Sequence, residues 1–267
     1  MILMRYLLPI RIDSAWFGFD ALDVEEILTV SSCVSLPAAG QGVVGVLRWR
    51  GQALAVVDIG SGAATLAPGT MRSRVVVVRV AGGGTIAVPV TAVQEVRERS
   101  AADPPMIDVP ALLRAVAGHE APGARPREQE LFHTDAPPGR PGGEVNLVTI
   151  SSERVDYALL TDAVRSIVSP RDWTGPEPFD FAEIAHAPRA GGAPQERLVV
   201  VSAAGRELVL RVAGAVSFRQ LEASQLLPLP PLARGRASGD LVDRIAFLDD
   251  QPPLLLLNPA AFPAASA

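Results

Sequence analysis

The chain has 267 residues, of which 48% are hydrophobic, and a formal net charge of −5 at pH 7. This length and apolar content supply a core for one large domain or two of ordinary size, without help from metal ions or disulfide bonds. The negative charge removes the attraction that draws proteins to nucleic acids and anionic membranes, so we expect protein partners and no nucleic acid.

The sequence shows no signal for export or membrane insertion. The opening stretch Met1–Ile10 is interrupted by Arg5 and Pro9, and no run of about 18 apolar residues occurs anywhere. The single cysteine, Cys33, excludes a disulfide bond within the chain and stands beside Val34, which indicates a small buried thiol. We therefore expect a cytoplasmic protein with no direct membrane insertion.

Short apolar runs separated by Gly, Pro and Asp turns predict strands, and with them an all-β fold with a few short helices. In the first half we expect strands at Tyr6–Ile12, Val43–Trp49, Leu54–Asp58, Val75–Val80 and Ile86–Val90. Residues 117–143 are rich in glycine and proline and lack apolar periodicity, which is typical of a linker. In the second half we expect strands at Val145–Ile150, Leu198–Val201, Leu208–Val212, Ile245–Leu248 and Leu254–Leu257.

The two halves share three blocks in the same order, which indicates an internal repeat. The apolar residues Phe17, Phe19, Val24, Ile27 and Leu28 recur 140 positions later as Tyr157, Leu159, Val164, Ile167 and Val168. Apolar positions at i, i+3 and i+4 in that block predict a strand end followed by one helical turn.

The second block predicts a hairpin in each half, because Val76–Val78, Gly82, Ile86 and Val93 recur 123 positions later. The third block matches Ile107–Leu112 with Leu257–Phe262, 150 positions later. These changes of offset mean that the second half lacks a central strand pair found at Val43–Ile59. The first half lacks a late one like Arg244–Leu257.

The stretch Gly45–Gly51, which reads GVLRWRG, and the following Ala55–Ile59 resemble the signature of CheW-like domains, a G-V-x-N-L-R-G turn leading into P-V-V-D-L. Val24–Ile27 resembles the V-x-E-I helix of the family, and Leu36-Pro37 its L-P. Ile245–Asp250 with Leu254–Leu257 resembles its closing hairpin. The resemblance covers about 230 residues in two copies.

The resemblance implies a fold and a function. It implies two CheW-like domains, each of paired small five-stranded barrels, at residues 4–116 and 144–264 with the linker 117–143 between them. It further implies a non-enzymatic adaptor in chemotaxis-type signalling, which couples the cytoplasmic tips of chemoreceptors to a CheA-like histidine kinase. No cofactor, metal ion or catalytic residue belongs to that function.

The resemblance also assigns residues. Arg50 occupies the place of the groove arginine of the family, and a guanidinium there can bind a carboxylate or a helix C-terminal carbonyl, unless it bonds its own loop. Trp49 should point to the opposite face of a regular strand, as core or as an interface anchor. Val24, Glu26 and Arg48 complete the candidate partner-binding residues.

Three further residues are structural candidates. We expect Gly45 to allow close packing, Gly51 to sit at a turn, and Asp58 to bond turn amides more than partners. The sequence also departs from the family pattern, because Arg48 and Trp49 replace Asn and Leu, and the second copy lacks L-R-G. Phe179-Asp180-Phe181 is a possible remnant of V-D-L there.

Two alternatives remain. A degenerate CheW-like scaffold repurposed for motility, polarity or another signalling pathway is the nearer one. The distant one is a nucleotide-binding enzyme, because Gly40, Gly42 and Gly45 match G-x-G-x-x-G. That site needs a strand before the glycines and a helix after them, and Gly51 leaves no room for the helix. His119, His133 and His186 show no metal-ligand spacing.

Overall fold

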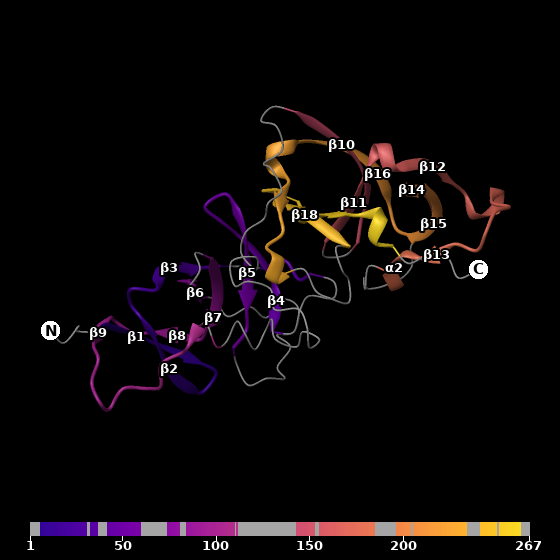
Figure 1. The fold of residues 1–267 in the computed structure, drawn as a ribbon. Helices are drawn as coiled ribbons and strands as arrows, with labels where there is room; N and C mark the ends of the chain where they lie inside the picture. Colours follow the sequence, from indigo (N-terminus) through magenta and orange to yellow (C-terminus); the bar gives the residue numbers. More distant parts are fainter. Residues whose placement is uncertain are drawn as a thin grey trace. The chain divides into compact units, whose positions relative to one another are not determined.

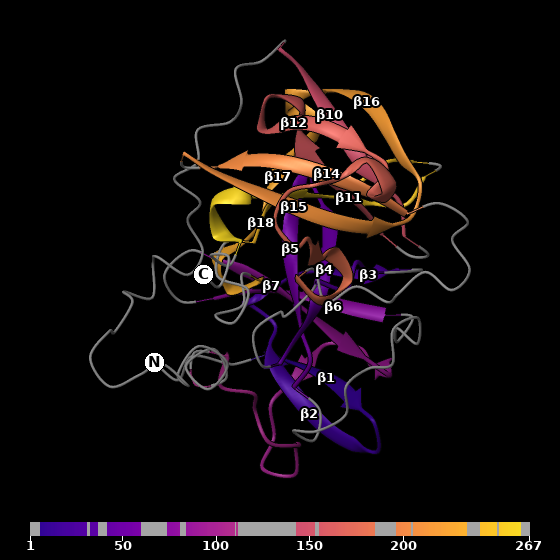
Figure 2. The same cartoon turned by 90° about the vertical axis from the view of Figure 1, so that its right-hand side faces the viewer.

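The computed structural model describes most of the chain and divides it into two compact units. The described residues are 6–30, 33–36, 42–59, 74–80, 84–109, 111, 143–152, 155–184, 196–203, 205–233, 241–249 and 251–262. Unit 1 comprises Met1–Thr134 with Pro230–Ala233, and unit 2 comprises Asp135–Leu229 with Arg234–Ala267. Figure 1 and Figure 2 show that strands are the main secondary structure of each unit.

The first sheet of unit 1 is built on the N-terminal hairpin. β1 (Tyr6–Ile12) pairs antiparallel with β2 (Ala15–Asp20) around a two-residue turn in which Asp13 has a φ of 54°. The short strands β8 (Ala92–Val93) and β9 (Arg97–Glu98) pair with the other side of β1. Leu7 and Ile10 are fully buried on opposite faces of β1, so this small sheet is covered on both faces.

The second sheet of unit 1 has five strands in the order β3-β6-β7-β5-β4. These strands are β3 (Val24–Thr29), β4 (Val43–Trp49), β5 (Gln52–Val57), β6 (Arg74–Arg79) and β7 (Thr85–Val90). Valine-rich runs form β6 and β7, since β-branched side chains suit a strand that is buried on both faces. One core cluster contains Leu47, Leu54, Val56, Val75, Val77 and Ala87.

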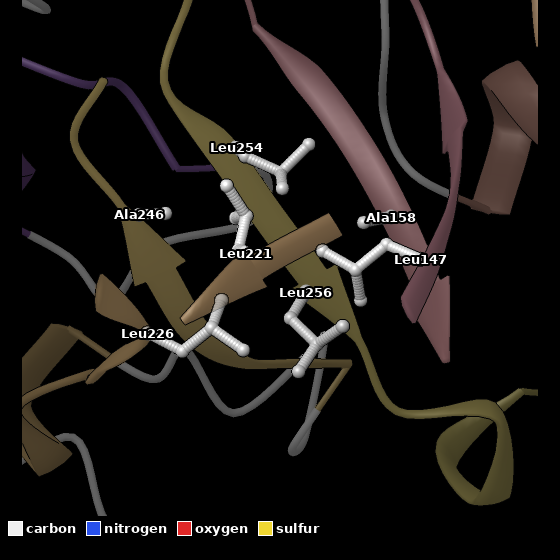
Figure 3. Close-up of a cluster of buried hydrophobic side chains, with 7 residues drawn as sticks. All are labelled: Leu147, Ala158, Leu221, Leu226, Ala246, Leu254 and Leu256. Carbon is white, nitrogen blue, oxygen red and sulfur yellow. The ribbon is translucent and has the colours of Figure 1, made fainter. Parts of the chain in front are cut away.

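The first sheet of unit 2 has six strands in the order β16-β10-β11-β19-β18-β17. They are β10 (Glu144–Ile150), β11 (Asp156–Leu160), β16 (Val216–Glu222), β17 (Leu227–Pro228), β18 (Val242–Ala246) and β19 (Leu254–Leu257). Figure 3 shows the buried cluster formed by Leu147, Ala158, Leu221, Leu226, Ala246, Leu254 and Leu256. Leucines of the C-terminal strand β19 thus complete the core of this sheet.

The second sheet of unit 2 has four strands in the order β12-β14-β15-β13. They are β12 (Val164–Val168), β13 (Phe179–Asp180), β14 (Glu196–Ala203) and β15 (Arg206–Ala213). The short helix α2 (Phe181–Ile184) follows β13. The 3₁₀ helices are η2 (Thr161–Ala163), η3 (Pro170–Asp172), η4 (Ala223–Gln225), η5 (Pro231–Ala233, in unit 1) and η6 (Pro259–Ala261).

Strand pairing in the two units follows the same register. Leu8 pairs with Phe19, and 140 positions later Val148 pairs with Leu159. Ile27 pairs with Val76, and the corresponding pair is Ile167 with Val199. Both of the latter strand pairs contain a β-bulge at the same place, between Val24 and Glu26 in β3 and between Val164 and Ser166 in β12. The offsets found in the sequence therefore relate paired residues in space.

Within the described residues, each unit has a strand pair that the other lacks. The five-stranded sheet carries β4 at its edge, whereas the four-stranded sheet ends at β13, which pairs with β15 in parallel as β5 pairs with β7. Conversely, β11 is followed by β19, β18 and β17, whereas in unit 1 a single parallel bridge joins Gly18 of β2 to Met106. In unit 2 the corresponding pair is Ala158 and Leu256, which lie 140 positions after Gly18 and 150 positions after Met106.

The prediction of a helical turn at Val24–Leu28 is wrong, because these residues belong to β3. The reason is the bulge: one extra residue, Glu25, interrupts the alternation of side chains. Apolar residues then fall at i, i+3 and i+4, a spacing that also fits a helix. The corresponding prediction for Val164–Val168 is wrong for the same reason, because β12 carries the same bulge.

The all-β fold class is confirmed, and so is each of the ten predicted strands, with bounds that differ by a few residues at most. Tyr6–Ile12, Val43–Trp49 and Leu254–Leu257 agree at both ends. The predicted linker, 117–143, lies outside the described residues apart from Gly143. Within the described part of the chain, no helix has the length and apolar character needed to cross a membrane.

Candidate functional site

The site is built on the tight turn between β4 and β5. Trp49 pairs with Gln52, so Arg50 and Gly51 form a two-residue loop, and their φ angles are 45° and 78°. Positive φ at both central residues is the type I′ turn that matches the twist of a hairpin. Gly51 adopts this conformation freely, whereas Arg50 does so at a cost, as one of the two non-glycine residues with positive φ among those described.

The prediction that Trp49 and Arg50 point to opposite faces is wrong. The strand ends at Trp49, and the left-handed conformation of Arg50 turns its side chain back over the indole. The guanidinium carbon lies 4.6 Å from the centre of the Trp49 ring, which is within cation–π distance. Alternation of faces applies only while the strand remains regular.

Glu26 contacts both residues from β3, which stands at the opposite end of the strand order from β4. Its Oε2 accepts a hydrogen bond of 2.9 Å from Nε1 of Trp49 and an ion-pair hydrogen bond of 3.1 Å from Nη2 of Arg50. We call Glu26, Trp49 and Arg50 the Arg50 cluster. Three of the five candidate partner-binding residues thus lie together, although they come from positions 23 and 24 residues apart in the chain.

The bulge in β3 gives two consecutive carboxylates separate partners. Glu26 reaches the Arg50 cluster, while the preceding residue, Glu25, forms an ion pair with Arg79 of β6. The backbone amide of Arg79 also donates to the carbonyl of Asp23, at 2.7 Å. The bulge therefore directs acidic side chains of one strand to two arginines of the same sheet.

The Arg50 cluster is exposed enough to meet a partner. The side chain of Arg50 is 60% exposed and that of Glu26 is 39% exposed, whereas Trp49 is half-buried and packs against the core cluster of the sheet. An exposed ion pair contributes about 0 to 1 kcal/mol to stability, and an exposed cation–π contact about 0.5 to 1 kcal/mol. The cluster consequently orders the guanidinium more than it stabilises the fold.

Val24 and Arg48 lie outside this cluster. Val24 is half-buried at the start of β3, and its backbone pairs with Val78. Arg48 is exposed and pairs with Ala53, but alternation along β4 places its side chain on the other face from Trp49. None of the described contacts of the Arg50 cluster involves either residue.

Three structural candidates act through the backbone of the β4–β5 hairpin and the residues next to it: Gly45, Gly51 and Asp58. A Cβ atom on Gly45 would lie 2.3 Å from the carbonyl oxygen of Val34, which approaches closely because Val34 forms an antiparallel bridge with Val46. At Gly51 the added atom would meet open space, so only its φ angle demands glycine. Asp58 follows β5, and its amide donates to the carbonyl of Gly42 at 2.8 Å.

The nucleotide-binding alternative is contradicted by the elements around its glycines. Gly40 lies outside the described residues, but β4 begins at Val43 and continues through Gly45 to Trp49. A dinucleotide site needs the N-terminus of a helix at this point, so that backbone amides face the phosphates. A strand with its amides paired to β5 cannot supply them.

No metal centre is found among the described residues, which contain no group of three or more His, Cys, Asp or Glu side chains in suitable positions. His119, His133 and His186 lie outside the described residues. Cys33 is half-buried against the core cluster of the five-stranded sheet, and this burial raises the pKa of its thiol. A raised pKa reduces the thiolate fraction, which is the opposite of what a nucleophile needs.

Sequence reasoning missed a second tryptophan–arginine pair. Arg11 of β1 lies directly across from Trp16 of β2, and its guanidinium carbon is 6.0 Å from the indole centre. The signal was present in the sequence, because a cross-strand pair follows from a two-residue turn at Asp13-Ser14. The Arg11–Trp16 pair was not predicted, because the sequence analysis identified only the end of the strand Ala15–Asp20 and not its pairing with Tyr6–Ile12.

These features define a class, an all-β protein of paired small sheets with an exposed arginine on a tight hairpin. Residues 7–117 match the family model described as the CheW-like domain. This part of the chain is therefore a CheW-like domain, as the resemblance predicted. The family comprises chemotaxis-type coupling adaptors, which are scaffold proteins and not enzymes.

Comparison with solved structures finds the crystal structure of the scaffolding protein TtCheW from Thermoanaerobacter tengcongensis. It is 12% identical, the alignment covers 96% of this chain and 90% of that chain, and the TM-score is 0.20. A TM-score of this size is too low for the likeness to support a conclusion. A search among curated proteins finds no significant match.

Proposed function

We propose that this protein is a non-enzymatic adaptor that couples chemoreceptor tips to a CheA-like histidine kinase. The observation that carries the proposal is the Arg50 cluster: an exposed guanidinium, held in place by Glu26 and stacked on Trp49, on a CheW-like domain. The resemblance assigns Arg50 to the position that contacts the receptor. Its 60% exposure favours that role over bonding within its own loop alone.

The physical basis is binding by contact, with no bond made or broken. One edge of the guanidinium is engaged by Glu26, and the remaining N–H groups can donate to a carboxylate or to the C-terminal carbonyls of a receptor helix. Side chains already ordered in the free protein lose less conformational entropy on binding. The half-buried Trp49 adds apolar contact area beside the charge.

We propose further that unit 2 is a second, diverged CheW-like domain at residues 144–264, following the first at 4–116 and the linker at 117–143. The shared pairing register and the shared bulge support this assignment. Among the described residues, unit 2 has no strand that corresponds to β4, and therefore no counterpart of Trp49 or Arg50. The receptor-binding role therefore belongs to the first domain.

Limited proteolysis of the full chain tests the two-domain assignment. Cleavage confined to residues 117–143 and two protease-resistant fragments are expected, since linkers are cut before folded units. A single resistant fragment that spans residues 117–143 would contradict independent domains.

The remaining parts of the proposal follow from the family and from charge. CheW-like adaptors act in the cytoplasm, where receptor tips and the kinase meet, and we place this protein there. The net charge of −5 disfavours nucleic acid as a partner. Binding through the Arg50 cluster requires no cofactor or metal ion.

The alternative is a scaffold that has left chemotaxis and serves motility, polarity or another signalling pathway. The departures at Arg48 and Trp49 from the family pattern favour it, since these two residues immediately precede the proposed partner-binding residue Arg50. The two functions share the surface and differ in the partner.

A pull-down with purified CheA-like kinase and receptor cytoplasmic tips tests the proposal. The wild-type chain should retain both, and Arg50→Glu should weaken receptor binding at least tenfold, as expected for a binding hot spot. Arg206→Glu is the matched control, because Arg206 is an exposed arginine next to the turn glycine of the β14–β15 hairpin. Binding that ignores Arg50→Glu would remove the cluster from the proposal, and no binding of either protein would favour the repurposed scaffold.

A further inference from the structure

The outer edge of β11 in unit 2 is covered by an apolar strand. Asp156, Tyr157 and Ala158 pair in parallel with Leu254, Leu255 and Leu256 of β19. The amide of Asp156, which points away from β10, donates to the carbonyl of Pro253 at 3.0 Å. This edge is therefore fully hydrogen-bonded along the first half of β11.

The equivalent edge of β2 in unit 1 is covered at one point. Gly18 bridges to Met106, its amide donates to the carbonyl of Pro105 at 3.0 Å, and its carbonyl accepts from Ile107 at 2.9 Å. Backbone groups alternate in direction along an antiparallel strand, so the amide and carbonyl of Trp16, two residues earlier, point to the same outer side. Among the described residues, no backbone group pairs with Trp16 there.

The chain forms a turn at the residues that precede this bridge. The offset of 150 positions that relates Met106 to Leu256 makes Asp103 the counterpart of Pro253. Asp103, however, belongs to a turn in which its amide donates to the carbonyl of Ser100 at 3.3 Å. Its side chain, only 4% exposed, forms an ion pair of 2.8 Å with Arg97. This pair fixes the turn, and among the described hydrogen bonds the amide of Trp16 has no counterpart of the bond from Asp156 to Pro253.

Side chains at this edge indicate what would bind there. Trp16 is 37% exposed, and the guanidinium of Arg11 lies against its ring. Nε of Arg11 is buried and has no hydrogen-bond partner within the described part of the chain. An apolar surface next to an incompletely bonded cation favours an apolar segment that carries an acidic side chain.

We propose that the outer edge of β2 at Trp16 is a docking site for an extended strand supplied by another protein, apolar and bearing at least one carboxylate. The strand adds to the sheet through the amide and carbonyl of Trp16, by β-strand addition. It takes the place that β19 occupies in unit 2. The site does not use the Arg50 cluster, so it supplies this adaptor with a second, independent contact.

The probe is a fluorescent peptide with the sequence of residues 249–259, because this segment of the chain contains both Asp249-Asp250 and the four leucines of β19. It is titrated with the full chain, and binding is followed by fluorescence anisotropy. Saturable binding is expected. Trp16→Pro removes the outward amide without removing a hydrogen bond to β1, and should weaken binding at least tenfold.

Further variants separate the contributions. Trp16→Ala keeps the amide and removes the indole, and Arg11→Gln removes the charge; each should weaken binding severalfold. Leu22→Ala is the matched control, since Leu22 is 72% exposed in the turn after β2 and plays no part in the site. Arg50→Glu should bind the peptide like wild type, so failure of this inference is distinguishable from failure of the proposed adaptor function. Circular dichroism verifies that each variant is folded.

Amide exchange measured by NMR on the full chain identifies other occupants. The amide of Trp16 should exchange rapidly in the free protein and become protected when the peptide binds, whereas that of Asp156 should be protected throughout. Protection of Trp16 in the free monomer would mean that the chain covers this edge itself. Protection that appears only with increasing protein concentration would assign the edge to a second copy. Either of these two exchange results would overturn the proposal. So would peptide binding by Trp16→Pro that equals wild type, or the absence of saturable binding.

Discussion

The five-stranded sheet of unit 1 and the four-stranded sheet of unit 2 agree in their interior and differ at one edge. Their central strand pairs keep the same register and the same bulge. In the described part of the chain, only the first sheet extends to a strand like β4 and its hairpin, which carries Trp49 and Arg50. Trp49 and Arg50, two of the proposed partner-binding residues, therefore stand on the part of the sheet whose absence leaves the pairing of the other strands unchanged.

Unit 2 covers its smaller core in another way. Trp173, which follows η3, packs against the cluster of Leu198, Val200 and Val209. Its indole Nε1 donates to the carbonyl of Pro176 at 2.8 Å, and a Cβ atom on Gly175 would lie 2.3 Å from the ring. An indole thus packs on both sheets, but in unit 2 it bonds its own loop and has no arginine stacked on it among the described contacts.

The largest effect on stability is expected at Gly45, which lets the hairpin edge approach Val34. Gly45→Ala should lower the free energy of unfolding of unit 1 by about 3 kcal/mol, because a backbone carbonyl must move to admit the Cβ atom. Gly51→Ala meets no atom and has only its φ of 78° to overcome, which costs about 1 kcal/mol. Urea unfolding measures both. Equal losses would show that close packing at Gly45 is not what holds this edge.

The two tryptophans provide the next test. Trp173→Ala should cost about 2 to 3 kcal/mol, because it removes most of the cover of a small core and leaves the Pro176 carbonyl without its donor. Trp49→Ala should cost less, since Leu47 and Leu54 also cover the core of its sheet. Urea unfolding that gives the reverse order would contradict the idea that Trp173 compensates for the missing hairpin.

Alkaline pH should affect unit 2 through Tyr157. Burial raises the pKa of Tyr157 from 10.0 to about 12. Its ring packs edge-on against that of Phe181, with 5.2 Å between the two ring centres. Because the folded state binds this proton more tightly, its contribution is fully present below pH 10 and is lost as the pH rises toward 12. The loss is on the order of 2 kcal/mol, and Tyr157→Phe should abolish it. Urea unfolding of both proteins at several alkaline pH values checks the slope, and parallel slopes would disprove the assignment.

The smallest effect on stability is expected within the Arg50 cluster itself. Glu26→Gln should change the free energy of unfolding by less than about 1 kcal/mol, because the ion pair is exposed. The fluorescence of Trp49 should nevertheless change, as its Nε1 loses a charged acceptor and its ring loses the stacked guanidinium. Arg79→Gln, which breaks the neighbouring pair with Glu25, is the control and should leave this fluorescence unchanged. A large loss of stability in Glu26→Gln would make the cluster structural.

Sequence reasoning captured the regular parts of this protein. Valine and leucine runs between turn residues are enough to locate Val43–Trp49 and Leu254–Leu257, because period and composition act locally. It failed at Val24–Leu28, where one bulged residue converts the period of a strand into that of a helix. The stacking of Arg50 on Trp49 was also missed, since it depends on the turn type and not on alternation along the strand.

Hydrogen exchange of the full chain, with and without a purified receptor tip, shows whether the Arg50 cluster binds the receptor. We expect the receptor tip to slow exchange at the β4–β5 hairpin around Trp49–Gln52 and to leave the β14–β15 hairpin of unit 2 unchanged. Protection confined to unit 2, or a bound receptor tip with no protection at the Arg50 hairpin, would contradict this expectation.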